Sequence, residues 1–277
     1  MDYAVRSHGI SQRRACRLLR QSRAICFYKS KADPHLEVRA RMREITQTRV
    51  RFGYRRVHVM LRREGCLAGK KLVYRLYREE NLQLRSKRPK RRKMAVARRA
   101  RFQASKPGQA WAMDFVADQL VNGKTFRLLT IVDVFSREAL AVDVGQRLRG
   151  EHVVAALNRL AAQRGAPKVI FADNGSEFTG RLMDLWAYHH QVRLDYSRPG
   201  KPTDNSFVES FNGSLRDECL NVNWFETIEE AKAIVGAWRA DYNESRPHTA
   251  HDGVPPGIFA RRHKDLNVLQ IGRDVEN

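Results

Sequence analysis

Short apolar segments follow one another closely between residues 110 and 196, and their order permits few folds. The first three are rich in β-branched and aromatic side chains, which is typical of buried strands. Asn122-Gly123, between the first two, is a strong signal for a tight hairpin. Helical and strand patterns then alternate, which predicts an α/β domain with a mixed five-stranded sheet. The predicted strands are 111–116, 126–134, 140–144, 168–172 and 193–196, and the predicted helices are 151–163, 180–190, 206–220 and 226–243.

Upstream of this domain the sequence shows only helical patterns. Residues 10–28 resemble a helix-turn-helix whose first helix is capped by Ser11. Residues 33–81 predict three short helices, separated at Gly53 and Gly65, in the manner of trihelical DNA-binding folds. The predicted division of the chain is a helix-turn-helix-like segment at 1–30, a trihelical domain at 31–84, a basic linker at 85–108, a catalytic core at 109–220 and a helical extension at 221–277.

Positive charge is concentrated in the first part of the chain. Residues 1–110 hold 32 Lys and Arg against 7 Asp and Glu, a net +25, whereas residues 111–277 hold 20 against 23, a net −3. An excess this one-sided indicates a polyanionic partner, and nucleic acid is the leading candidate. An anionic membrane is the rival, but no apolar run approaches the roughly 18 residues needed to span one.

Neither a leader nor a zinc site is expected. The N-terminus alternates apolar residues with Arg instead of forming a signal peptide, so we expect a cytoplasmic protein. The four cysteines are scattered, without a Cys-x-x-Cys pair, and buried or surface thiols explain them better than zinc ligands do. They are Cys16, Cys26, Cys66 and Cys219.

Three acidic residues stand in contexts suited to metal-dependent phosphodiester chemistry. Asp114 lies in a predicted buried strand, Asp173 ends another and is followed by Asn174-Gly175, and Glu209 opens a helix. If the three converge within about 4 Å, each pair repels by about 4 kcal/mol at a surface-like dielectric. Hard divalent cations relieve such repulsion, and Mg²⁺ or Mn²⁺ suits oxygen ligands best.

Other acids and bases in this region compete for these roles. Asp133 also lies in a strand, but we rank it below Asp114 because Ser136 or Arg137 in the next turn can satisfy it. Asp118 is expected beyond the strand, in a loop. Arg216 lies two helical turns after Glu209 on the same face, where it can hold a scissile or flanking phosphate; the alternative is an ordinary helix face.

Several motifs together resemble the DDE transposases of bacterial insertion sequences, in particular the second-frame (OrfB) product of the family usually numbered three. That family shares its ribonuclease H-like core with retroviral integrases. The resemblance covers nearly the whole chain, including the 35-residue separation of Asp173 from Glu209. The motifs lie at 52–56, 74–79, 111–115, 133–137, 173–178, 199–213 and 242–248.

The resemblance implies that Asp114, Asp173 and Glu209 are the catalytic, metal-binding triad, with two Mg²⁺ or Mn²⁺ ions per site. It also implies contacts with terminal inverted repeats and target DNA, action as a homo-oligomer in the bacterial nucleoid, and association with, or fusion to, a first-frame OrfA segment. The retroviral zinc arrangement is absent from the N-terminus. The predicted DNA contacts are Arg216, Lys201, Asn205, Arg55, Arg56, Lys90, Arg91 and Arg92.

The implied reaction is cleavage by water followed by attack of the freed 3′-hydroxyl on a second phosphodiester, without a covalent enzyme intermediate. Two alternatives remain at this point. A ribonuclease H-like nuclease would hydrolyse DNA without joining it, and a DNA-binding regulator would use only the basic helices.

Overall fold

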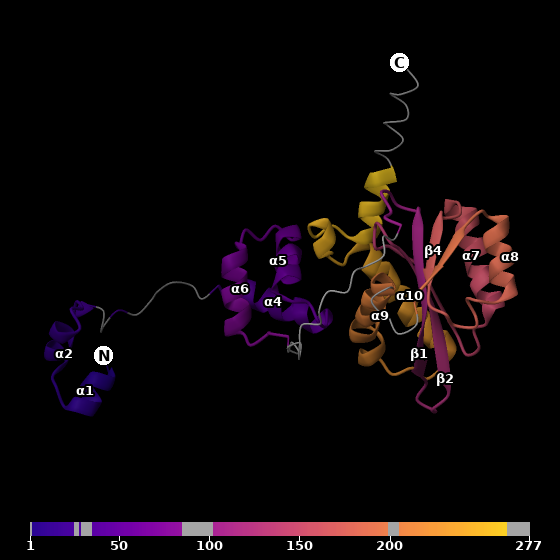
Figure 1. The fold of residues 1–277 in the computed structure, drawn as a ribbon. Coiled ribbons are helices and arrows are strands. Elements are labelled where there is room, and N and C mark those ends of the chain that lie inside the picture. The colour runs from indigo at the N-terminus through magenta and orange to yellow at the C-terminus, as the bar shows by residue number, and fades with distance from the viewer. Residues whose placement is uncertain (1, 25–27, 29–34, 85–101, 199–204, 265–277) are drawn as a thin grey trace, which may run out of the picture. The chain divides into compact units, whose positions relative to one another are not determined.

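The structure is a computed structural model that describes residues 2–24, 28, 35–84, 102–198 and 205–264 (Figure 1). The chain divides into two compact units, residues 1–40 and 41–277, and each is described separately. In the first, α1 (Asp2–His8) precedes α2 (Gln12–Leu18). Ser11 caps α2 as predicted, accepting a hydrogen bond from the Arg14 amide at 3.4 Å. Residues 25–27 of the second segment predicted for the helix-turn-helix lie outside the described residues.

The three helices predicted for 33–81 are present. They are α4 (Leu36–Thr48), α5 (Tyr54–Arg63) and α6 (Lys70–Glu79). Gly53 and Gly69 precede α5 and α6, and Gly65 follows α5 with a φ of +84° that favours glycine. Each of these short helices buries apolar side chains at helical spacing, so the helices are stabilised by packing. The buried residues are Met42, Ile45, Val57, Leu61, Val73, Leu76 and Tyr77.

The catalytic-core region contains the predicted mixed five-stranded sheet. Its order is β3-β2-β1-β4-β5, with β1, β2 and β3 antiparallel and with β4 and β5 parallel to β1. The β1–β2 turn uses Gly123 at φ +79°, with the Lys124 amide donating to the Asn122 side chain at 3.0 Å, which confirms the predicted hairpin. The strands are β1 (Ala110–Gln119), β2 (Thr125–Asp133), β3 (Ala139–Gly145), β4 (Val169–Ala172) and β5 (Arg193–Tyr196).

Helices cover both faces of the sheet (Figure 1). Successive side chains of β1 point to opposite faces, so Ala112 and Val116 belong to one apolar core while Trp111 and Met113 belong to the other. The first core lies under α9 (Ser206–Glu218) and α10 (Ile228–Glu244), and the second lies under α7 (Gly150–Arg164) and α8 (Arg181–His189). Asp114 shares the α9 side with Ala112 and Val116.

Two details differ from the sequence-based expectations. β1 continues to Gln119, so Asp118 lies within the strand rather than in a loop beyond it, because pairing with β2 extends to the hairpin. Short 3-10 helices, Leu220–Val222 and Thr249–His251, and a helical segment at 256–264 were not predicted. Within the described part of the chain, no helix has the length and apolar character needed to cross a membrane.

Candidate active site

Asp114 lies near the middle of β1, opposite Thr130 of β2, and its carboxylate is partly buried on the α9 side. Its Oδ2 accepts a hydrogen bond from Asn212 Nδ2 of α9 at 2.9 Å, and its Oδ1 accepts one from the Phe115 amide at 2.8 Å. Asn212 therefore links the strand carboxylate to the helix that carries Glu209.

Asp173 follows β4 directly and is exposed. The Gly175 amide donates to Asp173 Oδ1 at 3.0 Å, and Asn174 Nδ2 donates to the Ser197 carbonyl at 2.7 Å. A Cβ at position 175 would lie 3.0 Å from Asp173 Oδ1, so the glycine allows the carboxylate to fold back over the turn. The carboxyl end of a parallel strand is where open α/β sheets place their sites.

Glu209 lies in the first turn of α9, and its side chain is exposed. α9 buries Val208, Phe211 and Leu215 against the sheet, whereas Glu209 is exposed to solvent. Asn205, at the N-cap, donates from Nδ2 to the Met113 carbonyl at 3.2 Å and so fixes the start of α9 beside β1.

The pKa of Asp114 depends on its burial and on the charges of the two other predicted acids. The pKa of Asp114 is raised to about 6, mainly by burial and further by the negative charges of Asp173 and Glu209. The hydrogen bonds from Phe115 and Asn212 oppose this rise. Within the described segments, no group of three or more His, Cys, Asp or Glu is gathered closely enough to hold a metal ion. The three acids thus influence one another without forming a closed metal cage.

Asp133, the competing aspartate, has a different environment. Its Oδ1 accepts from the Ser136 amide at 2.6 Å and from Ser136 Oγ at 2.8 Å, and its Oδ2 accepts from the Gly108 amide at 2.7 Å. The side chain is 1% exposed. Ser136 satisfies this carboxylate as the sequence predicted, and Asp133 has the contacts of a structural residue.

The predicted DNA contacts fall into different environments. Arg216 is exposed, and its Nη2 donates to the Ala117 carbonyl of β1 at 3.1 Å. Arg55 is exposed and contacts the Tyr54 hydroxyl at 3.3 Å. Asn205 is 5% exposed, and its side-chain amide donates to the Met113 carbonyl of β1, so the DNA contact expected of it stays a prediction. Lys201, Lys90, Arg91 and Arg92 lie outside the described residues.

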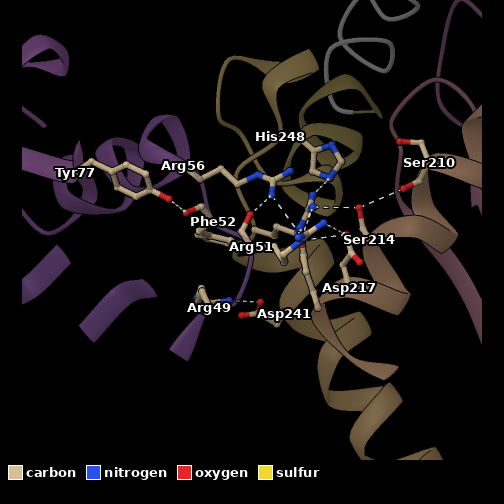
Figure 2. Close-up of polar contacts among 12 residues, drawn as sticks. Arg49, Arg51, Phe52, Arg56, Tyr77, Ser210, Ser214, Asp217, Asp241 and His248 are labelled. Carbon is tan, nitrogen blue, oxygen red and sulfur yellow. Dashed lines mark hydrogen bonds and ion pairs between the residues drawn. The ribbon is translucent and has the colours of Figure 1, made fainter. Parts of the chain in front are cut away.

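Arg56, also predicted to contact DNA, instead faces an acidic residue of α9. The segment joining α4 to α5, together with the start of α5, sends three arginines to acids of α9 and α10 (Figure 2). These arginines are therefore engaged within the protein in this structure. The pairs are Arg49–Asp241, Arg51–Asp217 at 2.7 Å and Arg56–Glu218 at 3.4 Å.

Sequence reasoning missed the residues that position the site. Asn212 lies three residues after Glu209, and this helical spacing, with the buried face of α9, is the signal that would have identified it. The 242–248 motif was recognised without a role. In the structure, Asn243 makes two hydrogen bonds to the Ala139 backbone, and Arg246 pairs with Glu218. The motif therefore holds α10 to the sheet and to α9.

Comparisons with known proteins agree with this architecture. Models described as integrase core domain match residues 104–202 and 190–256, and a model described as HTH-like domain matches residues 35–91. The chain is 46% identical over 257 residues to an uncharacterized protein of insertion element IS407 from Burkholderia multivorans, with 92% of each chain covered. It is 25% identical over 272 residues to the transposase InsF for insertion sequence IS3A from Escherichia coli, covering 90% of this chain and 93% of that one.

Among solved structures, the fold is similar to that of a chain in the intasome of simian T-cell lymphotropic virus. The TM-score is 0.52 at 17% sequence identity, and the match covers 79% of this chain and 73% of the viral one. At this identity the likeness concerns the fold alone, and it confirms the integrase-type core predicted from the order of strands and helices.

Proposed function

The chain belongs to the insertion-element transposases with an integrase core domain, which bind and transpose DNA, and we propose that Asp114, Asp173 and Glu209 are its catalytic residues. One observation carries this proposal: Asn212, one turn after Glu209 on α9, donates to Asp114 Oδ2, and β4, which Asp173 follows, pairs with β1, the strand of Asp114. The charges of Asp173 and Glu209 also contribute to the raised pKa of Asp114, and raised pKa values of this kind are common at functional sites.

The donor set fits divalent metal. All three side chains offer carboxylate oxygens, which Mg²⁺ and Mn²⁺ prefer, and Asp173 and Glu209 are exposed enough to move toward an ion. Asp114, Asp173 and Glu209 would hold up to two ions, which when bound polarise the phosphodiester and lower the pKa of water. Asn212 keeps one Asp114 oxygen directed toward α9, and the Gly175 turn holds the Asp173 carboxylate at the strand end.

The rest of the proposed chemistry is positioning. Water cuts one strand at an element end, and the resulting 3′-hydroxyl attacks a second phosphodiester. No side chain forms a covalent bond with DNA, so the protein contributes alignment and neutralisation of charge. Arg216 lies two turns after Glu209 on the same face of α9. Its guanidinium can hold a phosphate once its contact with the Ala117 carbonyl is released.

The proposed partners are the terminal inverted repeats, the target DNA, other copies of this chain and a first-frame OrfA segment. The charge distribution supports the first two, because the +25 of residues 1–110 suits a polyanion. The helices α4 to α6 have the sequence pattern of trihelical DNA-binding domains and match the HTH-like model. A homo-oligomer would allow two element ends to be held together.

A strand-transfer assay tests the proposal. A duplex carrying the element's end, labelled on one strand, is incubated with a target plasmid and Mg²⁺ or Mn²⁺, using the wild-type, Asp114→Asn and Asp133→Asn proteins. We expect cleaved and joined products with the wild type and Asp133→Asn, and neither with Asp114→Asn. Cleavage without joined products would instead identify a nuclease, and normal activity of Asp114→Asn would remove this residue from the site.

A further inference from the structure

A cavity of about 390 Å³ lies beside the first turns of α9, the helix that carries Glu209. Its walls include Ser206 and Ser210, which flank Glu209 in the sequence of the helix. Arg56, Ser210, Ser214 and His248, which are labelled in Figure 2, also belong to its lining. The cavity combines cationic and hydroxyl side chains with the exposed ring of Phe207, and none of the acids proposed for catalysis lines it.

Arg137 is the residue in this cavity with the clearest unmet hydrogen-bonding capacity. Its guanidinium lies over the Phe207 ring, 3.9 Å from the ring centroid. Its Nη1 is buried, and the described residues provide no acceptor for it. A buried donor without an acceptor costs stability, and each such group in a native protein calls for a reason.

The backbone conformation of Arg137 positions its side chain. Arg137 ends the tight connection between β2 and β3 with a φ of +61°, a conformation that favours glycine. Its amide donates to the Asp133 carbonyl at 2.9 Å, which closes the turn. The closed turn therefore fixes the backbone from which the Arg137 side chain reaches the cavity.

The cavity has a positive electrostatic character. Arg246 is balanced by Glu218, with Nη2–Oε1 at 2.6 Å and Nε–Oε2 at 2.7 Å. Arg56 makes only a 3.4 Å contact with the same Glu218. The pKa of His248 falls to about 3, first because of burial and then because Arg246, His251, Arg56 and Arg137 surround it. Because His248 is neutral and the charged side chains of the lining are arginines, the cavity favours an anionic ligand.

We infer that this cavity binds one backbone phosphate of the DNA, close to the phosphodiester that is cut, with Arg137 Nη1 as the principal donor and the Ser206 and Ser210 hydroxyls as further donors. The inference rests on the proposed function, since Glu209 lies between these serines on α9. A guanidinium with a buried donor suits a phosphate oxygen, because charge-assisted hydrogen bonds of this kind are short and strong. The Ser206 and Phe207 amides, in the first turn of α9, add to the favourable field for an anion.

The experiment uses the full chain and duplexes carrying the element's end in which one phosphate at a time is replaced by an uncharged methylphosphonate. Binding is measured for the wild-type, Arg137→Gln, Arg137→Lys and Arg262→Gln proteins, the last as an exposed-arginine control in the helical segment at 256–264. We expect one methylphosphonate near the cleavage position to weaken wild-type binding about tenfold. The same replacement should have no further effect on Arg137→Gln, and Arg137→Lys should recover part of the loss.

Thermal unfolding of each variant separates misfolding from lost contact, and Ser206→Ala with Ser210→Ala tests the same coupling without changing Arg137. Because binding is the readout, it can succeed even if the catalytic assignment fails. Equal losses for Arg137→Gln at every methylphosphonate position would overturn the inference. A second outcome would also overturn it. If millimolar inorganic phosphate stabilises the wild type but not Arg137→Gln, while no methylphosphonate position depends on Arg137, the cavity binds free anions and not DNA.

Discussion

Two aspartates in neighbouring strands of the same sheet, Asp114 in β1 and Asp133 at the end of β2, have opposite surroundings. Asp133 is almost completely buried and accepts three hydrogen bonds from Ser136 and Gly108. Asp114 receives one hydrogen bond from another element, from Asn212, and one from the adjacent amide. The pKa of each is raised chiefly by burial, but the additional acids that raise it are Asp173 and Glu209 for Asp114, against Glu138 for Asp133.

Asp133 stabilises the fold through its hydrogen bonds, whereas Asp114 has fewer hydrogen bonds and a more acidic environment. A buried acid with its oxygens satisfied closes a turn, and removing it leaves donors without acceptors. An acid with few donors, whose pKa is raised by the charges of two other acids, is a candidate for binding a cation or a substrate. Each residue should therefore fail in a different assay when it is replaced.

The largest expected effect is on catalysis. Asp114→Asn should reduce cleavage and strand transfer by roughly a thousandfold or more, because it removes a ligand on which metal-assisted chemistry depends. Asp173→Asn and Glu209→Gln should behave in the same way, with binding to element ends nearly unchanged. The measurement is cleavage of a labelled end duplex alongside a binding assay.

The matched control is Asp133→Asn, which keeps the same change of charge in the neighbouring strand. At a temperature where this variant is folded, it should cut within a few-fold of the wild type. If Asp133→Asn is inactive while Asp114→Asn cuts normally, the two roles are reversed.

The next effect is on stability, where Asp133→Asn should be the more damaging of the two substitutions. Asp133→Asn should lower the free energy of unfolding by about 2–3 kcal/mol, because the amide of asparagine presents a donor to the Gly108 or Ser136 donors. Asp114→Asn should leave stability unchanged or increase it, since repulsion from Asp173 and Glu209 disappears. Urea unfolding at pH 7 measures both, and a larger loss for Asp114→Asn would contradict the comparison.

Much of this arrangement could be predicted from the sequence, because local patterns encode it. The Asn122-Gly123 hairpin, the succession of strands and helices along residues 110–196 and the three helices of 33–81 follow from turn residues and periodicity, and all are found in the structure. The preference for Asp114 over Asp133 also came from sequence, through Ser136 in the adjacent turn. The catalytic assignment itself stays a prediction.

Contacts between residues far apart in the chain could not be predicted. Asn212 and Asp114 are 98 residues apart, and no periodicity pairs them. Asn205 lies in a Pro- and Gly-rich loop sequence that predicts exposure, yet tertiary packing buries it against Met113. Arg56 was assigned to DNA from its charge, but only the fold brings Glu218 beside it.

A third prediction concerns pH. The unfolded Asp114 carboxyl titrates near 3.8 and the folded one near 6, so between these values folding takes up a proton and stability falls as pH rises. The loss is about 3 kcal/mol at most, is complete above pH 6 and is absent below pH 4. In EDTA, the wild type should therefore lose stability from pH 4 to pH 6 relative to Asp114→Asn, with Asp133 contributing equally to both proteins.

Divalent metal sharpens this test. Mn²⁺ added at pH 7 should stabilise the wild type by binding the folded state, whereas Asp114→Asn should gain much less. Parallel pH profiles for the two proteins, or equal stabilisation by Mn²⁺, would show that Asp114 is not held in an acidic site.

The smallest effect is expected at Asn212, which donates to Asp114 the kind of side-chain hydrogen bond that Ser136 donates to Asp133. Asn212→Ala removes the hydrogen bond to Asp114 Oδ2 and should raise the pKa of Asp114 further, because that hydrogen bond now opposes the effect of burial. We expect about a five- to tenfold loss in cleavage at limiting Mg²⁺, equivalent to roughly 1 kcal/mol, with most of the loss recovered at saturating Mn²⁺.

Asn243→Ala is the control, since it removes another buried amide, one bonded to Ala139. That variant should lose more stability yet keep the wild-type metal concentration for half-maximal activity. If Asn212→Ala also keeps it, Asn212 serves only to pack α9 against the sheet, and the carboxylate of Asp114 is positioned by its own strand.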